Sequence, residues 1–250
     1  IRARYVVGCD GMHSMVRDLA MIPFDGAAYP ESFMLADVRM DWPLAPGEGT
    51  LFLAPDGLML VAPLPGGHFR IVATLDPAPV EPSLADVQTL LDRRGPARAP
   101  ASVREVIWGS RFHVHHRMAR AYRSGNVFVA GDAAHVHSPA GGQGMNTGIQ
   151  DAQFLGALLA DVLAGRVETG ALDGYERVRR PIAEEVVRTT DRMTRFATLQ
   201  KPWQRRLRNG VMRAAGHIPA LRHGLVMQLS ELATRPAEWK PASATVDDAA

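Results

Sequence analysis

The sequence predicts an α/β fold, α+β overall, that combines part of a parallel sheet with a β-rich region and a helical carboxyl-terminal segment. Three observations predict it. Two short apolar runs, residues 4–8 and 126–130, lead directly into turns that contain glycine and aspartate. Residues 30–120 hold several short apolar runs separated by turn signals. Residues 145–199 show apolar side chains at helical spacing.

Composition places the chain among ordinary globular proteins. Its 250 residues fit one large domain or two small ones, and 46% hydrophobic with 22% charged residues excludes a disordered chain. No apolar run approaches the roughly 20 residues of a membrane helix, and no signal-peptide core follows Arg2 and Arg4. The single cysteine, Cys9, forbids an internal disulfide. These features predict a protein of a reducing compartment, the cytoplasm.

The elements of the first half are predicted in order from these patterns. The run at 4–8 does not alternate, which indicates a strand buried on both faces. Further strands are expected at residues 33–38, 50–53, 58–61, 69–74, 103–108 and 111–116. Turn signals at 55–57 and 65–67 predict that the strands at 50–53, 58–61 and 69–74 form an antiparallel meander. Ser83 is expected to cap a helix that ends near Leu91.

The second half is predicted to be mainly helical after a buried strand at 126–130. A helix from Met145 to Gly165 is apolar on most faces and is therefore expected to be buried. A long helix is expected at 171–199, with Pro181 bending or dividing it. Two short amphipathic helices and a disordered tail complete the prediction, at residues 203–215, 220–233 and 235–250.

The charge of the chain is mild overall but uneven. A net charge of +2 and a pI near 9.0 are too weak for a dedicated nucleic-acid binder, and no nucleic-acid motif occurs. Residues 201–223 nevertheless contain no acid and several bases: Lys201, Arg205, Arg206, Arg208, Arg213 and Arg222. This segment is either the solvated face of docking helices or an amphipathic patch for a membrane surface.

The strongest chemical signal is the run at residues 127–146. A strand that ends in Gly131 and Asp132 places a carboxylate at the carboxyl edge of a sheet, where α/β proteins bind ligands and where it accepts from a ribose or ribityl hydroxyl. The glycines that follow allow a flat ligand to approach the backbone closely. The loop then opens a helix, whose N-terminus favours negative charge. The alternative interpretation is that the Gly-Asp pair is only a tight turn and that the glycines after it are only a loop.

This run resembles the second flavin motif of the FAD-dependent aromatic-ring hydroxylases, the group A flavoprotein monooxygenases similar to para-hydroxybenzoate hydroxylase. Residues 7–17 resemble the other internal motif of that family, Asp-Gly followed by serine and arginine. The resemblance covers residues 1–234. It implies a partial FAD-binding, Rossmann-like domain with an inserted mixed or antiparallel β-sheet substrate domain and a C-terminal helical segment.

The resemblance also assigns residues and domains. Asp132 resembles the aspartate that binds the ribityl or pyrophosphate region of FAD. The cofactor-binding residues implied are Asp10, Gly11, Arg17, Gly131, Asp132, Pro139, Gly142, Gln143, Gly144, Met145 and Asn146. No catalytic residue is assigned, because the flavin carries the chemistry; Pro139 and His135 are candidates beside it. The implied domains are 1–25 (strand and Asp-Gly motif of the FAD domain), 26–122 (substrate), 123–165 (Gly-Asp motif and flavin-facing helix), 166–234 (helices) and 235–250 (tail).

The family reaction sets the expected cofactor and partners. NAD(P)H reduces FAD, O2 adds at flavin C4a, and the hydroperoxide transfers one oxygen atom to a phenolic or polyketide-like aromatic substrate. An epoxidase, a halogenase and a ubiquinone-pathway hydroxylase stay open as alternatives. The family also begins with a Gly-x-Gly-x-x-Gly unit that seats the ADP half of FAD. This sequence contains no such unit, so it is expected to be the carboxyl part of such an enzyme. The activity of this chain alone stays open, and a truncated remnant that binds a ligand or a partner is the further alternative.

Clustered histidines raise two other possibilities. His113, His115 and His116 lie together, and His135 and His137 lie near the second motif. No metal is predicted, because no carboxylate or cysteine stands at recognisable ligand spacing. A histidine near the flavin is instead a hypothetical proton shuttle for a phenol, and the candidates are His113, His115 and His135.

Overall fold

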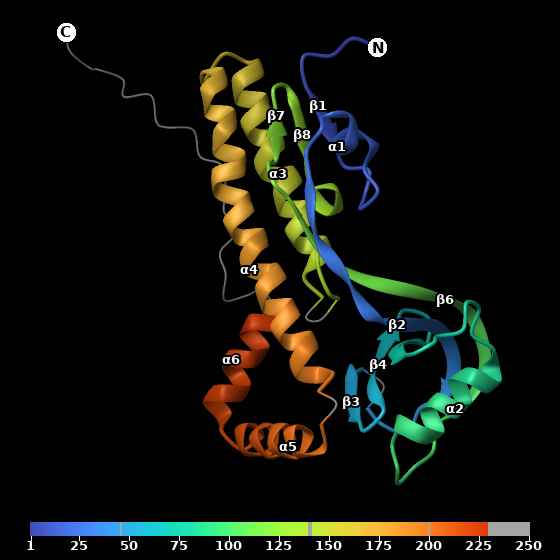
Figure 1. Cartoon of the computed structure of the whole chain (residues 1–250). Coiled ribbons are helices and arrows are strands. Elements are labelled where there is room, and N and C mark those ends of the chain that lie inside the picture. The colour runs from blue at the N-terminus through green and yellow to red at the C-terminus, as the bar shows by residue number, and fades with distance from the viewer. Residues whose placement is uncertain (46, 140–141, 200, 230–250) are drawn as a thin grey trace. The chain divides into compact units, whose positions relative to one another are not determined.

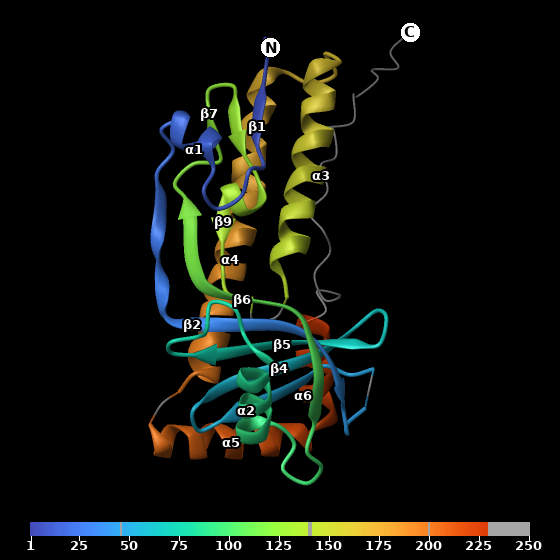
Figure 2. The same ribbon diagram turned by 90° about the vertical axis from the view of Figure 1, so that its right-hand side faces the viewer.

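A computed structural model describes residues 1–45, 47–139, 142–199 and 201–229 (Figures 1 and 2). The chain divides into two compact units. Unit 1 comprises residues 1–27, 116–191 and the segment from residue 220, and unit 2 comprises residues 28–115 and 192–219. Both units contain helices and strands, which confirms the predicted α/β fold class.

A small sheet anchors unit 1. Strand β1 (Val6–Gly8) runs parallel to β8 (Val127–Val129), and β7 (Arg123–Ser124) pairs antiparallel with β8. The prediction that β1 is buried on both faces is wrong, because Val6 and Val7 are 44% and 38% exposed. In the described chain only β8 pairs with β1. An apolar run therefore predicted the strand but not what covers it.

Two long helices pack side by side in unit 1 (Figures 1 and 2). They are α3 (Gly144–Leu163) and α4 (Asp173–Ala197), whose last residues belong to unit 2. Phe154 and Leu158 of α3 enter a core with Phe128 and Tyr175. The expectation that this helix is buried is wrong, because an exposed face runs along its whole length, from Met145 through Ile149 to Leu163. Unit 1 also contains short α1 (Met15–Leu19), α6 (Pro219–Leu229) and the 3-10 turn η2 (Thr169–Leu172).

Pro181 does not divide the long helix, contrary to one of the two expectations. Helix α4 continues without a break through this residue. Proline removes the amide that would bond the carbonyl of Arg177. Pro181 and Arg177 are both exposed, so water can form a hydrogen bond with that carbonyl. The missing hydrogen bond within the helix therefore costs little stability.

The sheet of unit 2 has the order β3–β4–β5–β2–β6. Its strands are β2 (Phe24–Asp41), β3 (Thr50–Ala54), β4 (Gly57–Leu64), β5 (His68–Leu75) and β6 (Ser102–Ala119), of which β2 and β6 begin or end in unit 1. The antiparallel pairing of β3 with β4 and of β4 with β5 confirms the predicted meander. Within unit 1, the end of β6 pairs with β9 (His135–Val136).

The two strands expected at 103–108 and 111–116 are one strand of 18 residues, β6. Gly109 lies between the two expected ranges. A Cβ at this position would lie 2.9 Å from Pro82 Cδ and 3.2 Å from the Leu35 carbonyl oxygen. Glycine at this position allows close packing inside a strand rather than a turn.

Helix α2 (Leu84–Arg94) covers one face of the unit 2 sheet. Ser83 caps it as predicted, in a capping box with Asp86. Val87 and Leu90 pack into the same core as Met34, and this core also holds Met59 and Ile71. Helix α5 (Pro202–Gly216) matches the amphipathic helix expected at 203–215. The end of the helix expected at 220–233 and the tail at 235–250 lie outside the described residues.

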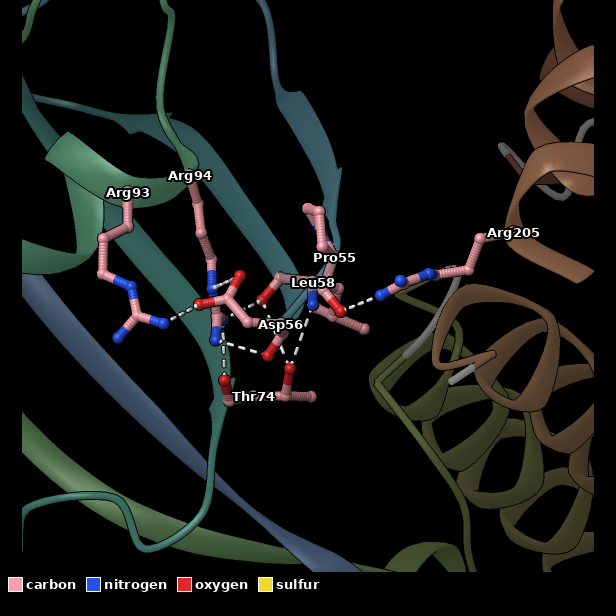
Figure 3. Close-up of polar contacts among 7 residues, drawn as sticks. All are labelled: Pro55, Asp56, Leu58, Thr74, Arg93, Arg94 and Arg205. Atoms are coloured by element: carbon pink, nitrogen blue, oxygen red, sulfur yellow. Dashed lines mark hydrogen bonds and ion pairs between the residues drawn. The ribbon is translucent and has the colours of Figure 1, made fainter. Parts of the chain in front are cut away.

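A buried arginine fastens the end of α2 to the meander (Figure 3). The Arg94 side chain is 2% exposed. It donates hydrogen bonds to the carbonyl oxygens of Leu58 at 3.0 Å and Thr74 at 2.7 Å, and to the Asp56 carboxylate and carbonyl at 3.1 and 2.8 Å. Gly57, between Asp56 and Leu58 in the sequence, has φ +142°, and a Cβ on it would lie 2.4 Å from Thr74 Oγ1. Arg94 therefore joins the β3–β4 turn, β5 and α2.

A paired aspartate on the unit 2 sheet predicts a pH dependence of stability. Arg70 donates to both carboxylate oxygens of Asp37, at 2.8 and 2.9 Å. These hydrogen bonds hold the pKa of Asp37 below its ordinary value, although burial opposes them. Because the pKa is lower in the folded state, this contribution to stability is complete above the unfolded pKa and is lost as the pH falls through the folded pKa.

We expect Asp37→Asn to lower the free energy of unfolding by about 1 kcal/mol at pH 7, a value discounted because Arg70 is 43% exposed. The loss should shrink towards zero as the pH falls below the lowered pKa that Asp37 has in the folded protein, because the wild-type carboxylate is then protonated too. Urea unfolding of both proteins at pH 7 and at an acid pH below that pKa measures it. An equal difference at both would show that the pair contributes nothing through its charge.

Candidate cofactor site

The two predicted motifs meet at one edge of the unit 1 sheet. Strands β1 and β8 are adjacent and parallel, with Gly8 opposite Val129, so their carboxyl ends lie together. The Ala130 amide donates to the Gly8 carbonyl at 3.0 Å. Asp10 follows the first strand and Asp132 follows the second. This edge is where open α/β sheets bind ligands, so pairing of the strands brings two distant parts of the sequence to one candidate site.

The first motif is a turn that is shaped by its own aspartate. The Asp10 carboxylate accepts from the Val16 amide at 3.2 Å, and its pKa is lowered mainly by a hydrogen bond with the Ser14 side chain. Ser14 itself caps α1 by accepting from the Arg17 amide at 3.0 Å. Gly11 has φ +83°, which glycine adopts without strain. Asp10 and Gly11 therefore fix the path of the chain after β1.

Arg17 connects the first motif to the second. Arg17 is 4% exposed. Its Nη1 donates to the carbonyl oxygens of Met12 at 3.0 Å and Ala133 at 3.2 Å. The guanidinium also lies 4.0 Å from the centre of the Phe24 ring. These contacts give Arg17 a role in holding the two turns together. A direct contact with a cofactor stays a prediction for this residue.

The second motif begins as a tight 3-10 turn, η1 (Gly131–Ala133), after β8. Gly131 has φ +58°, and a Cβ on Gly148 of α3 would lie 3.2 Å from its Cα. The two glycines thus let α3 pack directly on the turn. Asp132 is exposed at this edge. Its carboxylate is accessible to a ligand hydroxyl, as the sequence interpretation requires.

The loop after the turn leads to an accessible helix start. Pro139 is exposed, and Gly142 has φ +68° with open space around a Cβ at that position. In the first turn of α3, Met145 is 74% exposed and Asn146 is exposed too. Gln143 and Gly144 are half-buried. An open helix N-terminus beside a glycine-rich surface accepts a flat ligand that carries negative charge.

A histidine that the sequence did not single out as a site residue borders this helix start. His137 Nδ1 lies 2.9 Å from the Ser138 carbonyl oxygen. Because a carbonyl oxygen only accepts, Nδ1 is the donor of this hydrogen bond. Burial lowers the pKa of His137, which keeps the ring neutral and leaves Nε2 as an acceptor. Among the described residues this buried Nε2 has no hydrogen-bond partner. A Cβ on Gly144 would lie 3.5 Å from it, so the acceptor is at the start of α3.

A buried network of charged and polar side chains around Asp151 holds the Gly131 turn in place. Asp151 of α3 and Arg179 of α4 have fully buried side chains, and Arg179 Nε donates to Asp151 Oδ1 at 2.8 Å. The other oxygen, Oδ2, accepts from His135 Nε2 at 2.7 Å and from the Gly131 amide at 3.2 Å. His135 is 1% exposed. It is therefore a buried partner of Asp151, and its predicted place beside a flavin stays a prediction.

Sequence reasoning missed Asp151 and Arg179. One signal was present, because an aspartate within an otherwise apolar helix face requires a buried partner. The packing of α3 against α4 decides which arginine is the partner of this aspartate. The spacing of residues in the sequence does not reveal how the two helices pack. In the other histidine group, His113 is exposed and His115 is half-buried, both on the part of β6 in unit 2, whereas His116 belongs to unit 1. No cluster of metal-ligand side chains occurs in the part of the chain that the structure describes.

Comparison with known proteins decides the family. The sequence model of one family, described as FAD binding domain, matches residues 1–190. This chain belongs to the FAD binding domain family. Pentachlorophenol 4-monooxygenase of Sphingobium chlorophenolicum is 36% identical over 199 residues, which are 77% of this chain and 36% of that protein. The 6-methylpretetramide 4-monooxygenase of Streptomyces rimosus is 40% identical over 203 residues, 78% of this chain and 35% of that protein.

Solved structures of FAD binding domain relatives share the fold. The anhydrotetracycline hydroxylase OxyS from Streptomyces rimosus has a TM-score of 0.72 and 35% identity, and the match covers 93% of this chain and 47% of that one. The p-nitrophenol 4-monooxygenase PnpA from Pseudomonas putida DLL-E4 has a TM-score of 0.76 and 26% identity, and covers 94% and 61%. The predicted resemblance to FAD-dependent aromatic hydroxylases is confirmed. The chain spans 36% and 35% of the length of the two curated relatives above.

Proposed function

We propose that this chain forms part of an FAD-dependent monooxygenase that hydroxylates a phenolic or polyketide-like aromatic compound with NAD(P)H and O2. The observation that carries the proposal is the meeting of the two motifs at the ends of β1 and β8, beside the open start of α3. Relatives named for pentachlorophenol and for a tetracycline intermediate support an aromatic substrate. The single cysteine, Cys9, is free, which supports a reducing compartment such as the cytoplasm.

The residues of the site fit FAD. The accessible Asp132 carboxylate would accept a hydrogen bond from a hydroxyl of the ribityl or ribose part. The surface at Gly142 to Asn146 would receive the flat ring system, and the N-terminus of α3 would stabilise negative charge on it. When bound, FAD supplies electron transfer from NAD(P)H and oxygen transfer to the substrate ring.

The contributions of this chain are then binding and orientation. Asp10, Gly11 and Arg17 would hold the pyrophosphate side of the site in register with Gly131, since Arg17 already bonds the second motif at Ala133. The β-rich unit 2 would contribute to the substrate side. In that unit the apolar side chains of β2, β4 and β5 are largely used in the core with α2, so substrate contacts would come from other positions.

We expect Asp132→Ala to weaken FAD binding by about 10- to 100-fold, the cost of one hydrogen bond to a charged group. Titration of FAD into the purified protein, followed by quenching of flavin fluorescence, measures this. Asp92→Ala, on the exposed side of α2, is the control and should bind like wild type. The same titrations are made with the longest natural polypeptide that contains this sequence. Equal binding by Asp132→Ala would contradict the role assigned to Asp132, whereas no saturable binding by either folded wild-type protein would favour the non-catalytic alternative.

A further inference from the structure

The contacts of helix α5 with the rest of unit 2, as far as the structure describes them, come from one side of the helix. Arg208 is 2% exposed and donates through Nη1 to the Ala197 carbonyl, at the end of α4, at 2.7 Å. Arg205 reaches from α5 to the carbonyl of Pro55 in the β3–β4 turn (Figure 3). Gln204 and Ala215 are half-buried on the same side. These contacts fix which face of α5 points inward.

Another face of α5 carries exposed apolar side chains, which we call the α5 stripe. Trp203, Leu207 and Val211 are 61%, 62% and 55% exposed. They follow one another at a spacing of four residues, which places them along one face of the helix. Large apolar side chains gathered on one exposed face are typical of an interaction surface rather than of a solvated helix.

Positive charge accompanies the stripe. Arg206 and Arg213 are exposed and lie along one flank of the α5 stripe by helical geometry. No acid occurs between residues 201 and 223, so the segment offers no negative charge of its own to these guanidinium groups. An apolar stripe with a tryptophan at one end and arginines at its edge is the pattern of a helix that lies in a membrane interface.

We propose that α5 docks on the surface of a membrane that contains anionic lipid. The α5 stripe would enter the interface, and Arg206 and Arg213 would meet the lipid phosphates. None of the helices in the described ranges is long and apolar enough to cross a bilayer, so the contact would be a surface contact. A second copy of the chain fits less well, because two such faces would bring like charges together. The proposal does not depend on the proposed function.

Co-sedimentation of the full chain with vesicles tests the proposal. We expect binding to phosphatidylcholine vesicles that contain phosphatidylglycerol and far weaker binding to phosphatidylcholine alone, with a loss on addition of salt. The double variants W203S/L207S and R206Q/R213Q should each bind at least about tenfold more weakly. Matched controls are Leu51→Ser, an exposed leucine on β3, and Arg98→Gln, an exposed arginine after α2. Both controls should bind like wild type.

A second readout reports insertion directly. Brominated acyl chains should quench part of the tryptophan fluorescence of the wild-type chain, and Trp203→Phe should remove that part. No binding of the folded wild-type chain to anionic vesicles would overturn the proposal, and so would equal binding by all variants. If W203S/L207S instead reduces the oligomeric size of the lipid-free protein, the α5 stripe is a contact between copies and the proposal is wrong.

Discussion

Asp151→Asn is expected to lower the free energy of unfolding by about 3–5 kcal/mol. The substitution keeps the size of the side chain but removes its charge. Arg179, whose side chain is fully buried against Asp151, would then hold a charge without a counter-ion. The Gly131 amide and the His135 ring would also lose a charged acceptor.

Urea unfolding followed by circular dichroism measures this loss. Glu185→Gln is the matched control, since Glu185 pairs with Arg188 on α4 but both side chains are more than half exposed. That variant should lose no more than about 1 kcal/mol. The double variant D151N/R179M should be more stable than Asp151→Asn alone, because it removes the unpaired charge too. If Asp151→Asn is no worse than Glu185→Gln, the buried pair does not stabilise unit 1.

The comparison of sequence and structure shows which features were predictable. The strand, turn and helix around Gly131 and Asp132 were predictable because their signals follow one another within a short stretch, and local order needs no knowledge of packing. The meander of β3, β4 and β5 and the cap at Ser83 were found for the same reason. These features depend on neighbours in the sequence, and propensities describe them well.

The features that were missed depend on packing between distant segments. Val6 has the same side chain whether or not another element covers β1, so its exposure was not predictable. Strand β6 was predicted as two strands, and the neighbours that crowd Gly109 within it, Pro82 and Leu35, are remote in sequence. The partnership of Asp151 with Arg179 joins two helices in the same way. The sequence therefore located the candidate site but not the network that supports it.

Arg94→Met is expected to cost about 3–5 kcal/mol in unit 2, while Arg93→Met should cost no more than about 1 kcal/mol. Both arginines pair with Asp56, and both stand at the end of α2. They differ in burial, since their side chains are 2% exposed for Arg94 and 62% for Arg93. Loss of Arg94 would also leave the carbonyl oxygens of Leu58 and Thr74 without their charged donor.

Thermal and urea unfolding of the two variants makes a controlled comparison, because charge, side-chain type and ion-pair partner are the same. A large loss for Arg94→Met alone would show that burial and carbonyl bonds, rather than the ion pair, give this arginine its effect. Equal losses would place the stabilisation in the Asp56 pair itself. If Arg94→Met alone causes a large loss, α2 holds the β3–β4 turn in place. Arg205 of α5 donates a hydrogen bond to the Pro55 carbonyl in that same turn. The Arg94→Met variant should then also loosen α5, which faster amide exchange in residues 202–216 would reveal.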